Sequence, residues 1–96
     1  MMHRVLVVDD EEITVNAVSN YILSNFGVEV YRAYSGPEAQ KILRARRFDV
    51  VITDISMPAM SGMELLDFIK HFWPKCRVIL LTAYADFAYA HHALQY

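Results

Sequence analysis

The sequence has a single cysteine, little net charge and no long apolar run. Cys76 cannot form an internal disulfide, which fits a reducing compartment. The net charge of −2 argues against direct nucleic-acid binding by this segment, because such binding depends on excess positive charge. The apolar runs are a few residues long, whereas a helix that crosses a bilayer needs roughly 20. With no signal-peptide pattern at the N-terminus either, we expect a cytoplasmic chain that makes no membrane contact.

The sequence also lacks linkers, internal repeats and low-complexity tracts. Its 96 residues, of which 55% are hydrophobic, suffice for one small domain with its own core. We therefore treat residues 1–96 as one domain.

Four short stretches have the pattern of β-strands. Residues 4–8 and 50–54 each contain a continuous valine-rich apolar run, which is typical of strands buried on both faces. Residues 28–33 alternate apolar and polar side chains, which indicates a less buried strand at an edge of the sheet. Residues 77–82 form a fourth apolar strand that ends at Thr82.

Helices are predicted between the strands. Residues 11–25 carry apolar side chains at three- and four-residue spacing, which predicts a helix that ends near Gly27. Ser35 is a candidate N-cap for the second helix, and Pro74 follows the third helix at residues 62–72. A fourth helix is predicted over residues 87–95. The expected inward-facing residues are Ile13, Ala17, Val18, Tyr21 and Ile22 in the first helix, Ala39, Ile42 and Leu43 in the second, with Phe48 after it, and Met63, Leu65, Leu66, Phe68 and Ile69 in the third.

The strict alternation of strands and helices predicts the fold class. Short connections between alternating elements favour a parallel sheet with helices on both faces and right-handed crossovers. The first and third strands are the most apolar, so we expect them to be adjacent and central.

Polar side chains follow three of these strands. Asp9 and Asp10 come after the first strand, Asp54 closes the third, and Thr82 closes the fourth. If the first and third strands are neighbours about 5 Å apart, the three carboxylates converge. Their mutual repulsion calls for a cation, and Mg²⁺ fits best because it accepts few protein ligands and keeps its waters.

This arrangement suits phosphoryl chemistry. Asp54 can act as a nucleophile toward phosphorus, while Thr82 and backbone N–H groups hold the phosphoryl oxygens. Each residue also has a purely structural interpretation: Asp54 as a turn residue, Asp10 as a helix N-cap and Thr82 as the end of a strand. The combination at neighbouring strand ends favours the site.

The sequence as a whole resembles the receiver domain of two-component response regulators. The resemblance covers the whole chain and rests on residues 6–11 (LVVDDE), 54–62 (DISMPAMSG) and 80–83 (LLTA). It implies a three-layer α/β/α flavodoxin-like fold with a parallel sheet, of which this chain holds four of the five βα units.

The resemblance also implies the roles of the site residues. Asp54 would accept a phosphoryl group from a sensor histidine kinase. Mg²⁺ would be bound by Asp9, Asp10, Asp54 and the backbone carbonyl of Ser56, and Thr82 would contact the phosphoryl group and act as a switch residue. Such a receiver assists its own phosphotransfer and dephosphorylation but is not a conventional enzyme.

Residues 82–90 (TAYADFAYA) resemble the subgroup whose receivers precede an AraC-type output domain. The family has a fifth strand that ends in a lysine, and this sequence stops before it, so we expect a truncated receiver domain. The fourth strand then becomes an apolar edge, and we expect a homodimer through the fourth strand and fourth helix. DNA contact would belong to a missing output domain.

Three alternatives compete with a signalling switch. The first is a pseudo-receiver that acts only as a protein-interaction module. The second is an aspartate-nucleophile phosphatase, which typically has a second Asp where this chain has Ser56. The third, a dinucleotide-binding domain, needs a G-x-G-x-x-G motif where the chain has residues 9–12 (DDEE).

Overall fold

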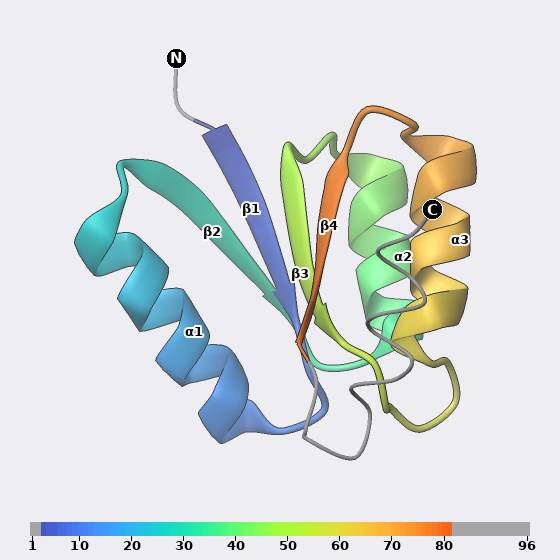
Figure 1. The fold of residues 1–96 in the computed structure, drawn as a ribbon, viewed down its shortest axis with the longest axis horizontal. Coiled ribbons are helices and arrows are strands. Elements are labelled where there is room, and N and C mark those ends of the chain that lie inside the picture. The colour runs from blue at the N-terminus through green and yellow to red at the C-terminus, as the bar shows by residue number, and fades with distance from the viewer. Residues whose placement is uncertain (1–2, 82–96) are drawn as a thin grey trace.

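The computed structural model describes residues 3–81, which form one parallel sheet with helices on both faces (Figure 1). In chain order the elements are β1 (His3–Val8), α1 (Glu12–Asn25), β2 (Val28–Ala33), α2 (Gly36–Ala45), β3 (Val50–Asp54), α3 (Gly62–Phe72) and β4 (Arg77–Leu81). The strand order is β2-β1-β3-β4, and every neighbouring pair is parallel. The predicted α/β class is confirmed, as are the central position of β1 and β3 and the edge position of β2.

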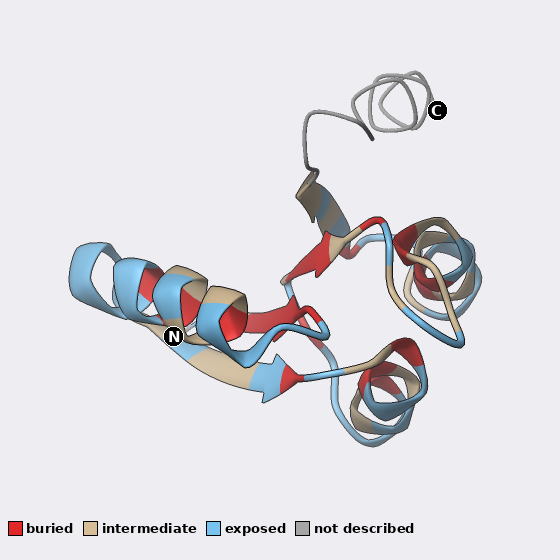
Figure 2. Ribbon diagram, turned by 90° about the horizontal axis from the view of Figure 1, so that it is seen from below, coloured by how far each residue is buried: buried red, intermediate tan, exposed pale blue. Residues whose placement is uncertain are grey.

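The sheet separates two hydrophobic layers. Helix α1 covers one face, while α2 and α3 lie side by side on the other (Figures 1 and 2). Successive residues of β1 point into opposite layers: Val5 and Val7 pack with α1, whereas Leu6 and Val8 pack with α2 and α3. This two-sided burial explains why β1 has a continuous apolar run instead of an alternating one.

The inward face of α1 was predicted correctly only in part, since Ile22 is buried and Val18 is partly buried as expected. Its buried residues are Val15, Ser19 and Ile22, and Val18 packs against them in part. The predicted core residues Ile13 and Tyr21 are 83% and 65% exposed, respectively, and Ala17 is also exposed. The apolar residues of this helix lie around most of its circumference, so their spacing did not identify a single face.

Helix α1 ends just before Gly27, as predicted, and α2 begins after the predicted N-cap. Helix α1 ends with Phe26 in an extended conformation, and Gly27 does not have the positive φ of a left-handed glycine cap. Ser35 is the N-cap of α2, where its Oγ accepts a hydrogen bond from the N–H of Glu38 at 3.1 Å.

Helix α3 has the predicted bounds but a narrower buried face. Leu65 and Ile69 are fully buried, whereas Met63, Leu66 and Phe68 are half-buried. The indole N–H of Trp73 donates to the Leu43 carbonyl at 2.8 Å and so ties the end of α3 to α2. The fourth helix predicted at residues 87–95 and the switch candidate Thr82 lie outside the described residues.

None of the helices within residues 3–81 is both long enough and apolar enough to cross a membrane.

Candidate functional site

Three carboxylates meet at the carboxyl ends of the two central strands. Val8 of β1 is paired with Thr53 of β3, so Asp9 and Asp54 emerge from neighbouring positions. One carboxylate oxygen from each of Asp9, Asp10 and Asp54 lies within 4.8 Å of the others. The predicted convergence of these side chains is confirmed.

Backbone hydrogen bonds position Asp9. Its N–H donates to the Ala33 carbonyl at 3.2 Å, which links it to the end of β2. Its Oδ1 accepts a hydrogen bond from the N–H of Glu11 at 2.9 Å. Asp9 is buried, Asp54 is half-buried and Asp10 is exposed, so the cluster opens toward solvent at Asp10.

Asp10 does not cap α1. The N-cap of that helix is Glu11, whose side chain makes no capping hydrogen bond. The structural interpretation of Asp10 as an N-cap is therefore wrong, which leaves its carboxylate in the cluster.

The pKa of the Asp9 carboxyl is raised above its ordinary value. Burial is the main cause, and the negative charges of Asp54 and Asp10 act in the same direction, while the hydrogen bond from the Glu11 N–H opposes them. Three carboxylate oxygen donors that lie this close together are what a hard divalent cation requires. The residues present thus fit Mg²⁺.

Two residues that hold Asp54 were not recognised from the sequence. The hydroxyl of Thr53, which is fully buried, donates to the Asp54 carbonyl at 3.0 Å. Gly62, the first residue of α3, lies so close that a Cβ there would come within 2.1 Å of the same carbonyl oxygen. In the sequence, Thr53 is a polar residue within an apolar strand and Gly62 is a glycine at the start of a helix. Neither pattern shows that the residue contacts the Asp54 carbonyl.

The loop from β3 to α3 is tightly turned. Ala59 has a φ of 69°, and the Met60 N–H donates to the Pro58 carbonyl at 2.7 Å, which closes a three-residue turn of a strained kind. The Gly62 N–H then donates to the Ile55 carbonyl at 2.7 Å. This turn brings the start of α3 back against the end of β3, directly beside Asp54.

The other two predicted site residues are Ser56 and Thr82. Ser56 lies two residues after Asp54 and is exposed. Leu81 is paired with Asp54, and its carbonyl accepts a hydrogen bond from the Ile55 N–H at 3.2 Å. Thr82 is not among the described residues.

Comparison with known proteins assigns the chain to a family. A model described as the response regulator receiver domain matches residues 5–96. The chain belongs to this receiver family. Receivers are signalling domains of two-component phosphorelays, not conventional enzymes; they bind Mg²⁺ at acidic residues and interact with histidine kinases.

Similar proteins include regulators of transcription. The receiver is 36% identical, over 103 residues, to the transcriptional regulatory protein HptR of Staphylococcus aureus, a match that covers 99% of this chain and 40% of that protein. The chain spans about two fifths of the length of the Staphylococcus regulators it matches.

Solved structures confirm the flavodoxin-like receiver fold. The REC domain of AraT, a response regulator from Geobacillus stearothermophilus, has a TM-score of 0.90 and 35% identity over 99% of this chain and 75% of that one. A two component transcriptional regulator AraC from Clostridium phytofermentans has a TM-score of 0.83 and 34% identity over 91% of this chain and 72% of that one.

Proposed function

We propose that this receiver is a phosphorylation-dependent switch in which Asp54 is the phosphoacceptor, within one domain of residues 1–96. The observation that carries the proposal is the convergence of the Asp9, Asp10 and Asp54 oxygens within 4.8 Å at the carboxyl ends of β1 and β3. Ligands of parallel α/β proteins bind at this edge of the sheet.

Asp54 is the best placed of the three to act as a nucleophile. Asp9 is buried and its Oδ1 is engaged by the Glu11 N–H, while Asp10 lies on the exposed side of the cluster. A carboxylate oxygen of Asp54 attacks the phosphorus of a phosphohistidine, the P–N bond breaks, and the imidazole leaves with the electron pair. The product is an aspartyl phosphate.

Asp9, Asp10, Asp54 and the backbone carbonyl of Ser56 would hold Mg²⁺ beside this oxygen. The bound ion supplies positive charge that offsets repulsion between the Asp54 carboxylate and an anionic donor. Thr53 and Gly62 fix the backbone of Asp54 and so orient its side chain. Thr82 is proposed to contact the phosphoryl group, and the receiver is proposed to assist its own phosphotransfer and dephosphorylation.

The test is phosphorylation by a small acyl phosphate in the presence of Mg²⁺, followed by mass spectrometry of the intact protein. We expect the addition of one phosphoryl group, and no addition to Asp54→Asn. Asp67→Asn is the matched control, because Asp67 is an exposed carboxylate on α3 away from the cluster. An unmodified wild-type protein in both this assay and a sensor-kinase assay would instead indicate a pseudo-receiver, a module that only binds other proteins.

We further propose that a sensor histidine kinase in the cytoplasm is the phosphodonor and that the output is transcriptional. The relatives named as transcriptional regulators support this output, and DNA binding would reside in an AraC-type domain outside this chain. The edge strand β4 and the segment after it are proposed as a homodimer interface. Analytical ultracentrifugation with and without acyl phosphate tests the dimer, and a monomer under both conditions would contradict it.

A further inference from the structure

A close contact joins α2 to the loop that follows Asp54. The loop from β3 to α3 and the connection from β2 to α2 lie at the same edge of the sheet (Figure 1). Here Met60 of the loop lies against Gly36, the first residue of α2. A Cβ at Gly36 would come within 2.6 Å of the Met60 Cβ, 2.8 Å of its Cγ and 2.9 Å of its Sδ. The Met60 side chain therefore lies along backbone that a side chain at Gly36 would cover.

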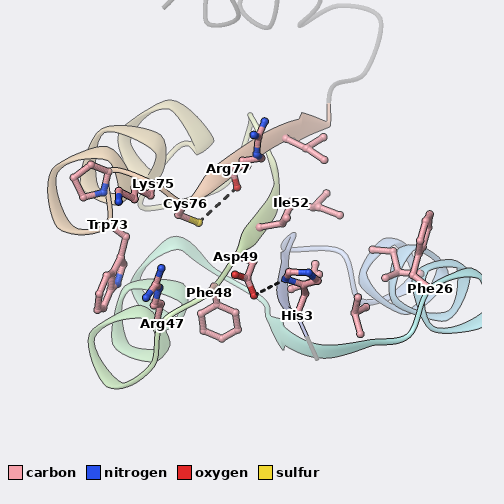
Figure 3. Close-up of a pocket in the computed structure, with 16 residues that line it drawn as sticks. His3, Phe26, Arg47, Phe48, Asp49, Ile52, Trp73, Lys75, Cys76 and Arg77 are labelled. Carbon is pink, nitrogen blue, oxygen red and sulfur yellow. Dashed lines mark hydrogen bonds and ion pairs between the residues drawn. The ribbon is translucent and has the colours of Figure 1, made fainter. Parts of the chain in front are cut away.

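Helix α2 is fixed at both ends, so it holds its side of this contact. Gly36 is buried at the start of the helix. Near the other end, the Leu43 carbonyl accepts the hydrogen bond from the Trp73 indole N–H at 2.8 Å. Trp73 lies at the amino-terminal edge of the sheet together with three cations, Arg47, Lys75 and Arg77 (Figure 3). A change at Gly36 is therefore not relieved by a shift of the whole helix.

The loop that carries Met60 needs a contact from outside. Ala59 has a φ of 69°, in the left-handed region that a non-glycine residue adopts at a cost. The turn from Pro58 to Met60 is of a strained kind. Met60 is half-buried and packs against the core layer beneath α2 and α3. Its side chain thus supplies packing that holds the strained turn in place.

The junction of β2 and α2 also holds Asp9. The Asp9 N–H donates to the Ala33 carbonyl at 3.2 Å, and Ala33 lies three residues before Gly36. This short segment therefore contacts the end of β1 on one side and Met60 on the other. Ser56, whose backbone carbonyl is a proposed Mg²⁺ ligand, lies four residues before Met60 in the same loop. The contact between α2 and the loop thus sets the position of Ser56 relative to Asp9.

We propose that Met60 is a positioning residue for the metal site and that it acts through Gly36. Its side chain holds the loop where the Ser56 carbonyl and the carboxylates can share one ion. This inference rests on the proposed function. The nearest atom to a side chain at Gly36 is the Met60 Cβ, which no change of rotamer moves. A substitution at Gly36 therefore displaces the loop backbone, although Gly36 itself touches no ligand.

The test measures Mg²⁺ affinity by amide NMR of the full chain, which is freed of metal with EDTA, dialysed and titrated with MgCl₂. We expect Met60→Ala to weaken Mg²⁺ binding about tenfold. Met60→Leu restores most of the side-chain volume and should stay within about twofold of the wild type. Met63→Ala is the matched control, because Met63 is also half-buried but belongs to α3. It should bind Mg²⁺ like the wild type.

A second measurement uses the metal-free protein. The Gly62 N–H donates to the Ile55 carbonyl at 2.7 Å and so closes the loop. In Met60→Ala we expect this amide to exchange with solvent about tenfold faster, relative to the amides of β1, than in the wild type. The comparison with β1 separates loosening of the loop from a loss of global stability.

Gly36→Ala tests the same contact from α2 without any change in the loop sequence. Gly36 does not have a positive φ, so alanine suits its backbone, and the three nearest atoms to the new Cβ all belong to Met60. This variant should also bind Mg²⁺ about tenfold more weakly, whereas Gly27→Ala, with no atom within 4 Å, should not. The double variant Gly36→Ala/Met60→Ala should bind no more weakly than the weaker single variant, because both substitutions disrupt one contact.

Several results would overturn the positioning role. These are unchanged Mg²⁺ affinity in Met60→Ala or Gly36→Ala, an equal loss in Met63→Ala, or multiplied effects in the double variant. If the wild type binds Mg²⁺ and is phosphorylated on Asp54 while any of these results is obtained, this inference alone fails. A wild type that binds no Mg²⁺ would overturn the proposed metal site together with the role of Met60.

Discussion

Ser19 lies on the buried face of α1, and its hydroxyl has no hydrogen-bond partner among the described residues. A buried hydroxyl without a partner loses its hydration and gains nothing in return. We predict that Ser19→Ala raises the free energy of unfolding by about 1 kcal/mol. Urea denaturation measures this change. Ser24→Ala is the control, because Ser24 is an exposed residue of the same helix and reports the difference in helix propensity alone. Equal effects of the two substitutions would show that the Ser19 hydroxyl is satisfied.

The Asp9 carboxyl makes stability depend on pH with a sign opposite to that of most acidic residues. Its pKa is raised in the folded state, chiefly by burial, so the folded protein binds this proton more tightly than the unfolded chain does. As pH rises past the ordinary value of 3.8, the unfolded chain ionises first and the contribution of Asp9 to stability falls. It stops falling once the folded carboxyl has also ionised.

We predict that Asp9→Asn is more stable than the wild type at neutral pH without Mg²⁺. Asparagine keeps an oxygen that can accept the hydrogen bond from the Glu11 N–H but carries no charge. The difference should shrink as pH falls through the window above 3.8. Thermal unfolding at several pH values with EDTA present measures it. If Asp9→Asn were less stable than the wild type at neutral pH, the prediction would be wrong, and charge repulsion among the Asp9, Asp10 and Asp54 carboxylates would not destabilise the fold.

At the scale of elements, α3 depends on the close approach of Gly62 to β3. A Cβ at this position would meet the Asp54 carbonyl oxygen at 2.1 Å and the Ile55 Cα at 2.8 Å, and backbone atoms cannot move aside as a side chain can. We predict that Gly62→Ala lowers the free energy of unfolding by about 2 kcal/mol and reduces phosphorylation of Asp54. Chemical denaturation and the acyl phosphate assay measure the two effects.

Gly27→Ala is the matched control for this prediction. No atom lies within 4 Å of a Cβ built at Gly27, and its φ is not positive. Its effect on the free energy of unfolding should stay within about 0.5 kcal/mol. If the two glycines tolerated alanine equally well, the proposed contact between α3 and the Asp54 carbonyl would be refuted.

At the scale of the whole molecule, Mg²⁺ should stabilise the folded chain. The folded state brings Asp9, Asp10 and Asp54 together, whereas the unfolded chain separates Asp54 from the other two. We predict a gain of about 2.7 kcal/mol in the free energy of unfolding when Mg²⁺ is at 100 times its dissociation constant. Asp54→Asn should lose most of this gain, and Asp67→Asn should retain it. Thermal shift titrations with MgCl₂ measure both.

The fold was predictable because the strands of this protein are short, apolar and separated by clear turn signals. Continuous runs such as residues 50–52 identify central strands, and the alternating pattern of residues 28–33 identifies an edge strand. The carboxylate cluster followed from topology, since the ends of adjacent parallel strands meet at one edge.

The sequence did not predict which side chains of α1 pack against the sheet, nor what Gly62 contacts. The apolar residues of α1 occupy several faces, so the choice of Val15 and Ile22 over Ile13 and Tyr21 depends on how the helix sits against the sheet. The contact between Gly62 and the Asp54 carbonyl likewise depends on the turn at Ala59, a non-glycine residue at positive φ. Both features arise from tertiary geometry, which local sequence patterns do not encode.

The acidic and basic edges of the sheet also give the receiver an electric dipole along its strands. The negative pole is at Asp9, Asp10 and Asp54, and the positive pole includes Arg47, Lys75 and Arg77. A charged partner therefore orients the receiver before contact, over distances of about 8–10 Å at physiological salt. An anionic phosphodonor meets the positive edge first unless cations surround its phosphohistidine. Metal loading weakens the negative pole, so Mg²⁺ would govern the encounter rate as well as the chemistry at Asp54.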